Sequence, residues 1–218
     1  MIIVATEEAA ISSHLASITK TKDITLFSGF MAALRDARKF TKRDQDTGHK
    51  LHGDDCGDFG SWLGAVGYLI LLDQIGGCFK PKSAKNIDGN QIIKALRYFT
   101  ELSLLEAKAI YALRCAFAHD FSLLNIHDKP GLTHIFTANQ GTTSPVVTLP
   151  IVPWDGNILN MYPENVTRIN LEALGDLVEN IYVKLIELSN SSDLKIELKG
   201  GPQELHIRYS FYSPNTRI

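Results

Sequence analysis

Apolar residues recur at helical spacing throughout the first half of the chain. Three helices are predicted here, the first and third from an apolar side at helical spacing and the second, the most apolar, as a buried helix. Their expected ranges are 25–40, about Asp58 to Ile75, and about 89–101, with a polar loop from Thr41 to Gly57 between the first two. Gly76-Gly77 is expected to end the second helix, because glycine is common just past a helix C-terminus.

The best specified helix runs from Ser103 to His119. Glu106 follows Ser103 by three residues, the spacing of a capping box in which each side chain bonds the other residue's backbone N–H. On a helical wheel one arc is apolar and consists of Leu105, Ala109, Ile110, Ala112, Leu113, Ala116 and Phe117. The opposite arc has small residues between Arg114 and His119, which would let a second helix approach closely. We therefore expect this helix to pack on two sides, once within the chain and once against a partner.

After this helix the pattern changes to alternation of apolar and polar residues. Strands are predicted at Leu132–Thr137 and Val146–Leu149, around a turn rich in glycine, threonine and serine. Alternating apolar residues return at 194–198 and 205–211, on either side of Gly200-Gly201-Pro202. This second pair predicts a C-terminal β-hairpin.

A long helix, Leu171–Leu188, is predicted between these two strand regions. Its apolar residues recur in alternating steps of three and four, which gives a coiled-coil-like seam: Leu171, Leu174, Val178, Ile181, Leu185 and Leu188. The fold class expected is mainly α, with a small β-hairpin or sheet elaboration toward the C-terminus. A helical bundle would span residues 1–130, and residues 131–218 would add β-hairpins and a long returning helix packed on the bundle.

Composition narrows the class of protein. The 218 residues are 44% hydrophobic and 21% charged, as is ordinary for a globular protein, and the net charge of −2 gives no general affinity for nucleic acid. Any RNA contact would have to come from a local patch. Three widely spaced cysteines fit a reducing cytosol better than a disulfide framework. The most apolar run, Trp62–Leu72, is too short to span a bilayer, so we expect a cytoplasmic protein without a membrane segment.

The candidate catalytic residues are Arg114 and His119, at the end of the capped helix. A guanidinium can bond a phosphate through two parallel hydrogen bonds, and an imidazole can accept or donate a proton near pH 7. This spacing alone carries little weight, since Arg43 and His49 form a similar pair in the polar loop. The position at the end of a capped, alanine-rich helix is what favours a functional interpretation.

Helix geometry restricts how this pair could work. Five residues apart, Arg114 and His119 are about 140° apart around a regular helix and about 7.5 Å apart along it. They converge poorly within one chain unless the helix unwinds near Ala118. In a symmetric dimer, two such helices would bring two Arg and two His around one groove. The structural alternative is that Arg114 pairs with a nearby acid and that His119 caps the last carbonyls of the helix.

The helical N-terminal portion, ending in the run Leu113–Asp120, resembles the HEPN superfamily. Those proteins are all-α bundles whose motif is Arg, four to six residues, then His, near the end of a late helix. The resemblance implies a metal-independent endoribonuclease, toxin-like or active in anti-phage defence, that needs no cofactor. Arg114 would bind the scissile phosphate of RNA and His119 would transfer the proton, which leaves a 2′,3′-cyclic phosphate at a site in the interface of a homodimer. It also implies a possible antitoxin or regulatory protein as a partner. Family members often have a polar residue directly after the Arg, where this chain has Cys115.

Two other functions remain open from the sequence. One is a non-catalytic HEPN-like module that binds RNA or a protein. The other is a metal-dependent hydrolase built on the loop His49–Asp58, which is dense in His, Asp and Cys, although a solvated loop is the simpler interpretation. Two clusters of basic residues could follow an RNA backbone or simply face solvent: Arg35, Arg38, Lys39, Lys42 and Arg43, and Lys80, Lys82 and Lys85.

Overall fold

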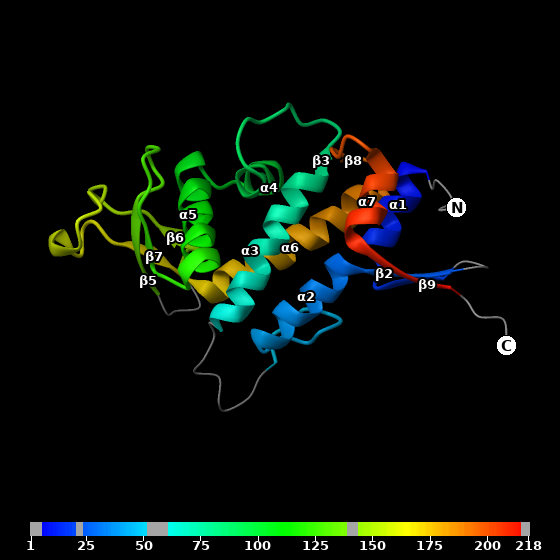
Figure 1. Cartoon of the computed structure of the whole chain (residues 1–218), viewed down its shortest axis with the longest axis horizontal. Coiled ribbons are helices and arrows are strands. Elements are labelled where there is room, and N and C mark those ends of the chain that lie inside the picture. Colours follow the sequence, from blue (N-terminus) through cyan, green and yellow to red (C-terminus); the bar gives the residue numbers. More distant parts are fainter. Residues whose placement is uncertain (1–5, 21–23, 52–60, 139–143, 215–218) are drawn as a thin grey trace.

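The computed structural model describes residues 6–20, 24–51, 61–138 and 144–214, and about half of them are helical (Figure 1). The α-helices of this part of the chain are α1 (Glu7–His14), α2 (Gly29–Phe40), α3 (Trp62–Cys78), α4 (Gln91–Phe99), α5 (Leu104–Asp120), α6 (Leu171–Asn190) and α7 (Gly201–Tyr209). Its strands are β1 (Ile18–Lys20), β2 (Ile24–Ser28), β3 (Phe79–Pro81), β4 (Leu124–Asn125), β5 (His134–Ala138), β6 (Val147–Thr148), β7 (Thr167–Ile169), β8 (Leu194–Ile196) and β9 (Ser210–Pro214). The fold is mainly α with small sheets, as the sequence predicts.

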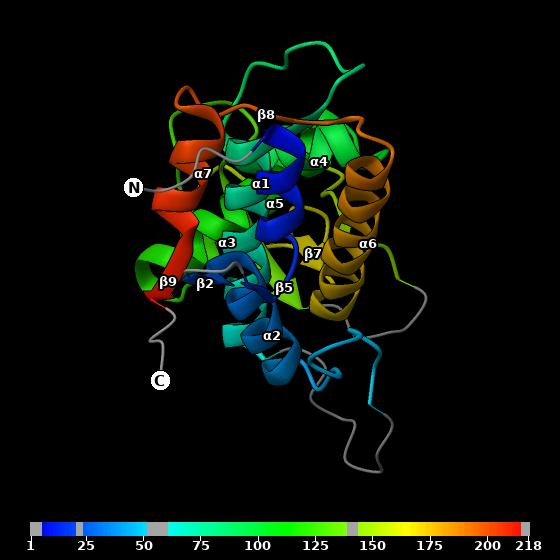
Figure 2. The same cartoon turned by 90° about the vertical axis from the view of Figure 1, so that its right-hand side faces the viewer.

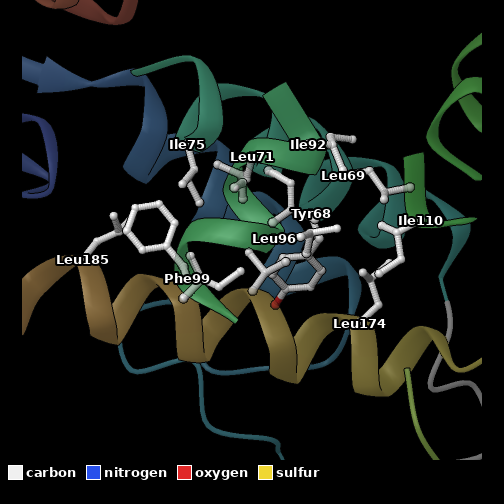
Figure 3. Close-up of a cluster of buried hydrophobic side chains, with 14 of the residues drawn as sticks. Tyr68, Leu69, Leu71, Ile75, Ile92, Leu96, Phe99, Ile110, Leu174 and Leu185 are labelled. Atoms are coloured by element: carbon white, nitrogen blue, oxygen red, sulfur yellow. The ribbon is translucent and has the colours of Figure 1, made fainter. Parts of the chain in front are cut away.

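Helices α3 and α6 form the centre of the hydrophobic core. Helix α6 stands at the right of Figure 2. In Figure 3 it lies below α3, α4 and α5, and buried apolar side chains of these three helices are gathered over it. The predicted seam of α6 is confirmed, because Leu174, Val178, Ile181 and Leu185 are each at most 1% exposed. One buried cluster extends from Ala10 to Leu205, so the bundle and the C-terminal elaboration share a core.

Helix α4 and the capping box of α5 are confirmed in detail. The predicted apolar side of α4 is buried, at Ile92, Ile93, Leu96 and Phe99. At the start of α5 the Ser103 hydroxyl accepts a hydrogen bond from the N–H of Glu106, whose carboxylate accepts one from the N–H of Ser103. These local signals were sufficient because they involve only residues near one another in sequence.

The predicted helix over 25–40 is correct only from Gly29 onward. Strand β2 occupies Ile24–Ser28 and is paired antiparallel with β1 on one side and β9 on the other. Ser28 then caps α2 by accepting a hydrogen bond from the N–H of Met31. The β-branched and aromatic residues of Ile24–Phe27 favour a strand. Backbone pairing with β9, from the far end of the chain, stabilises that strand over a helix.

The second predicted helix does not end at Gly76-Gly77. Helix α3 begins at Trp62, after its cap Ser61, and continues to Cys78, while the predicted start near Asp58 lies outside the described residues. Gly76 is required here for close packing, since a Cβ at this position would lie 1.8 Å from the Gln91 carbonyl oxygen of α4. The glycine therefore marks a helix contact and not a helix end.

The strand predictions identified two strands but missed the one between them. Strands β5 and β6 occupy the predicted segments, yet they are not neighbours: β5 pairs parallel with β7, and β6 pairs antiparallel with β7. The sheet has the order β4-β5-β7-β6 and lies beside α5 (Figure 1). Strand β7 is only three residues long, too short for alternation to reveal it.

The predicted C-terminal hairpin is wrong. Strand β8 pairs with β3, α7 begins at Gly201, and β9 pairs with β2. Pro202 in the first turn of α7 favours this helix, because proline fits where the N–H has no helical partner. No helix in the described part of the chain is both long and apolar enough to cross a bilayer.

A row of charged contacts joins α2 to α6. Glu172, Asp176 and Glu179 line one side of α6 at spacings of four and three residues, and we call them the acidic stripe. Arg38, which is 1% exposed, donates two hydrogen bonds to the carboxylate of Glu179, at 2.9 and 2.7 Å. Arg43 contacts Asp176 at 2.7 Å.

The same stripe holds the polar segment that follows α2. Lys50 lies 2.5 Å from Glu172 and 2.8 Å from Asp176. Although burial alone would raise the pKa of Asp176, hydrogen bonds from Lys50 and Arg43 bring that pKa below its usual value. Arg38 also donates to the carbonyls of Gln45 and Asp46, so it holds this segment as well as α6.

A buried histidine lies where α1 meets α3. His14 is 0% exposed, its Nδ1 has no hydrogen-bond partner in the described part of the chain, and its Nε2 lies 3.3 Å from the Gln74 amide nitrogen. The rings of Phe30, Phe79 and Tyr209 surround it. Burial, with a smaller contribution from His206, lowers the pKa of His14 from 6.5 to about 3.

We expect Glu179→Gln to destabilise the protein by about 3 kcal/mol, because it leaves the buried Arg38 cation without its counter-charge. Glu187→Gln, at an exposed position of the same helix, is the matched control and should change stability by less than about 0.5 kcal/mol. Urea unfolding at pH 7 measures both values. Equal losses in the two variants would show that the ion pair does not contribute.

We expect acid to destabilise the protein through His14. A histidine whose pKa is lowered by folding supports stability above pH 6.5, and this support is lost as the pH falls toward the folded-state pKa of about 3. Between pH 7 and pH 4 wild type should lose roughly 3 kcal/mol more free energy of unfolding than His14→Gln. His49→Gln, at an exposed histidine, should retain the wild-type pH dependence. If the free energy of unfolding of His14→Gln fell with pH as steeply as that of wild type, His14 would not be the source of the acid sensitivity.

Candidate active site on helix α5

Helix α5 is regular through both candidate residues. It continues to Asp120 and ends at Phe121, whose backbone is left-handed, with φ of 49°. The N–H groups of Phe121 and Ser122 donate to the carbonyls of Phe117 and Ala116, as in other left-handed helix ends. The backbone thus caps the helix, and His119 is exposed with no hydrogen bond to another described residue. The expectation that His119 might cap the helix is not met.

Arg114 does pair with an acid, as the structural alternative supposed. Its Nε lies 2.7 Å from Oδ2 of Asp73 on α3, and both side chains are partly exposed, at 33% and 24%. Burial raises the pKa of Asp73, and Arg114 opposes that shift. Within the described part of the chain the two terminal nitrogens of Arg114 have no hydrogen-bond partner. Asp73 therefore faces the Nε edge of the guanidinium as a counter-charge, although Nε makes no hydrogen bond within the described residues, and the terminal nitrogens are left available to an anion.

The face of α5 between Arg114 and His119 is largely uncovered. Ala118 is exposed, and Tyr111 and Cys115 are partly exposed. A hydrogen bond with the Cys115 thiol is the main cause that raises the pKa of the Tyr111 hydroxyl. The position where HEPN proteins often have a polar residue is thus occupied by a thiol engaged with its own helix.

The buried arc of α5 differs from the predicted one at two positions. Leu105 is 57% exposed although the wheel places it among the buried residues, and Ala107 is 0% exposed although the wheel places it opposite. A helical wheel gives the direction of a side chain but not where the neighbouring elements end. Leu105, in the first turn, lies where those elements leave it open.

Aromatic rings adjoin the C-terminal end of α5. Trp62 stacks on Phe117 with ring centroids 5.0 Å apart, and Phe121 stacks on the same Phe117 at 6.5 Å. Phe117 is buried, whereas Trp62 and Phe121 are 38% and 48% exposed. Exposed aromatic faces can stack on unpaired bases.

The sequence offered a signal for Asp73 but none for Trp62 or Phe121. Asp73 is the single charged residue of α3. A charged side chain in an otherwise apolar helix indicates an ion pair with a cation, because burying an unpaired charge is costly. Trp62 and Phe121 read simply as apolar residues at helix ends. The contact of Trp62 with Phe117 depends on the packing of α3 against α5.

The other sequence candidates do not form a site in the described residues. His49 is exposed, and the rest of its loop, from His52 to Asp58, lies outside those residues. A search of the described ranges finds no group of three His, Cys, Asp or Glu side chains that could hold a metal. The first basic cluster is divided, because Arg38 and Arg43 are buried against the acidic stripe. In the second cluster Lys80 is 9% exposed and bonds Asn86.

The regular helix keeps Arg114 and His119 apart within one chain. With no unwinding near Ala118, the two side chains leave the helix about 140° apart. They flank one open face and do not form one compact pair.

Comparison of the chain with protein-family models, with curated proteins and with solved structures finds no match.

Arg114→Ala should raise the pKa of Asp73 further above its usual value, because the guanidinium is what opposes the effect of burial. His119→Ala should leave that pKa unchanged. The carboxyl ¹³C shift of Asp73, followed by NMR through a pH titration, measures both. An unaltered titration of Asp73 in Arg114→Ala would show that the ion pair is absent in solution.

Proposed function

We propose that this protein is a metal-independent endoribonuclease of HEPN type, toxin-like or active in anti-phage defence, which works in the cytoplasm as a homodimer. The observation that supports this most is the open face of α5. One edge of it carries a guanidinium in ion-pair contact with Asp73, whose terminal nitrogens have no hydrogen-bond partner among the described residues, and the other carries an exposed imidazole. Both groups are accessible to a ligand outside the chain.

The proposed site is composite. Since Arg114 and His119 diverge on one helix, two copies of α5 facing each other would place two Arg and two His around one groove. The small side chains of Ala118 and Cys115 lie between them and allow the two helices to approach. Trp62 and Phe121 would then stack on bases next to the cleavage point.

The proposed reaction is an internal transfer at phosphorus. His119 of one protomer accepts the proton of the ribose 2′-hydroxyl, whose oxygen forms a bond to phosphorus as the bond to the 5′-oxygen breaks. The second imidazole, in its protonated form, gives a proton to the leaving 5′-oxygen. Arg114 bonds the non-bridging oxygens and stabilises the charge that develops on them. The products are a 2′,3′-cyclic phosphate and a 5′-hydroxyl.

A non-catalytic module that binds RNA or a protein is the second candidate. Two observations favour it: Arg114 is already paired with Asp73, and the Cys115 thiol is close enough to Tyr111 to raise the pKa of its hydroxyl. An arginine held in this way still binds phosphate. Without a polar residue at position 115 the imidazole would have less help in adopting a productive orientation.

Single-stranded and structured RNA, incubated with the purified protein in EDTA, should be cleaved to products ending in 2′,3′-cyclic phosphate, as identified by mass spectrometry. Arg114→Ala and His119→Ala should each lower the rate at least about 100-fold, the usual contribution of a proton-transfer or charge-stabilising group. Arg168→Ala and His127→Ala, both at exposed positions, are the matched controls and should cleave as wild type does.

The cleavage assay distinguishes the ribonuclease from the two other candidate functions. RNA binding without cleavage, weakened by Arg114→Ala alone, would favour the non-catalytic module. Cleavage that EDTA abolishes would instead favour a metal-dependent hydrolase. A strict monomer by light scattering, active at full rate, would contradict the composite site.

A further inference from the structure

The connection between β6 and β7 is a closely hydrogen-bonded loop that projects from the sheet end of the molecule, at the left of Figure 1. We call residues 151–165 the β6–β7 loop. Its base is closed by the N–H groups of Ile151 and Val152, which both donate to the Glu164 carbonyl, at 2.8 and 3.1 Å. The indole N–H of Trp154, which is 4% exposed, donates to the Asn157 carbonyl.

Side-chain hydrogen bonds fix the tip of this loop. The Asp155 carboxylate accepts from the N–H of Asn157 and from the amide of Asn160. Asn165, which is 8% exposed, accepts from the N–H of Tyr162 and donates to the Asn160 carbonyl. Of the loop's apolar residues, only Trp154 contributes its side chain to the hydrogen bonds that hold the backbone.

Those apolar side chains face solvent. Leu159 is 88% exposed and Ile151 84%, and the other large apolar residues of the loop are 55–65% exposed: Val152, Ile158, Met161 and Tyr162. Ile126, from the β4–β5 connection, is 65% exposed and adjoins Gly156. Contiguous exposed apolar side chains on an ordered scaffold are typical of surfaces that bind another molecule.

An acidic pocket opens among these apolar residues. It has a volume of about 460 Å³ and is lined by Val152, Pro153 and Tyr162 together with Asp155, Asn160 and Glu164. Hydrogen bonds from Asn160 and Asn157 lower the pKa of Asp155, so its carboxylate is charged at neutral pH. Among the described residues no cation pairs with Asp155 or Glu164, and Glu164 is exposed.

We propose that the β6–β7 loop is a docking surface for a segment of a partner protein that presents a lysine or arginine flanked by apolar residues. The cation would enter the pocket between Asp155 and Glu164, beside the Tyr162 ring, where both carboxylates and the aromatic face attract it. The flanking apolar residues would cover Ile158 and Leu159. The surface matches such a segment, because its pocket is lined by carboxylates and the exposed residues near the pocket are apolar.

Two other occupants fit less well. Nucleic acid is disfavoured because the carboxylates repel phosphate. An anionic membrane surface is disfavoured for the same reason. The loop contains neither Arg114 nor His119, so this inference does not depend on the ribonuclease proposal.

Peptides displayed on phage, with random sequences of twelve residues, provide a direct probe. Selection on the full-length protein should enrich peptides that have Lys or Arg between apolar residues. One enriched peptide, labelled with a fluorophore, is then titrated by anisotropy against wild type and variants. Glu164→Gln and Leu159→Ser should each weaken its binding at least about fivefold. The same peptide with norleucine in place of its basic residue should bind wild type at least about fivefold more weakly.

Matched controls are available elsewhere on the surface. Glu101→Gln removes an exposed carboxylate and Ile207→Ser an apolar side chain that is 63% exposed, and neither should change peptide binding. The inference is overturned if no peptide is enriched, if the enriched peptides lack a basic residue, or if Glu164→Gln and Leu159→Ser bind like the controls. Sedimentation with phosphatidylcholine vesicles, alone or with phosphatidylserine, tests the lipid alternative. Vesicle binding that Leu159→Ser abolishes would overturn the inference in favour of a membrane.

Discussion

The contact between Arg38 and Glu179 constrains much of this structure. A guanidinium that is 1% exposed requires a counter-charge and hydrogen-bond acceptors for all its nitrogens, and these come from α6 and from the polar segment after α2. Tyr68 of α3 donates to the same Glu179 carboxylate at 2.9 Å. Three helices thus meet at one polar point within an apolar core. Hydrophobic packing alone has little directional preference, whereas a buried ion pair is satisfied only when its two partners meet in the correct geometry.

The arrangement leaves α5 with two unlike faces. One lies in the common core against α4, α3 and the sheet, whereas the other retains Arg114, Cys115 and His119 at the surface. Asp73 connects the two regions, since it belongs to the central helix α3 and yet reaches the surface to hold Arg114. Arg114 is therefore paired with a residue of the central helix α3, which suits a group that must keep its orientation.

The two surfaces of interest differ in how they are built. The open face of α5 is part of a regular helix, so its chemistry follows directly from residue spacing. The β6–β7 loop has no such regularity, and its shape depends on the side chains of Asp155, Asn157 and Asn165 bonding to nearby backbone. Apart from Trp154, its apolar residues contribute no side-chain hydrogen bond to that shape.

The sequence by itself determined the elements whose signals are local: the capping box of α5, the apolar side of α4 and the seam of α6. It also indicated Arg114 and His119 as accessible residues on one helix. Only the tertiary structure decided that Ile24–Phe27 is a strand, that Gly76 lies in a helix contact, and that residues 201–214 form α7 and β9. In each of these cases the deciding partner is distant in sequence. The pairing of Asp73 with Arg114 was likewise settled by α3 packing against α5, because an ion pair forms between groups that the fold has already brought together.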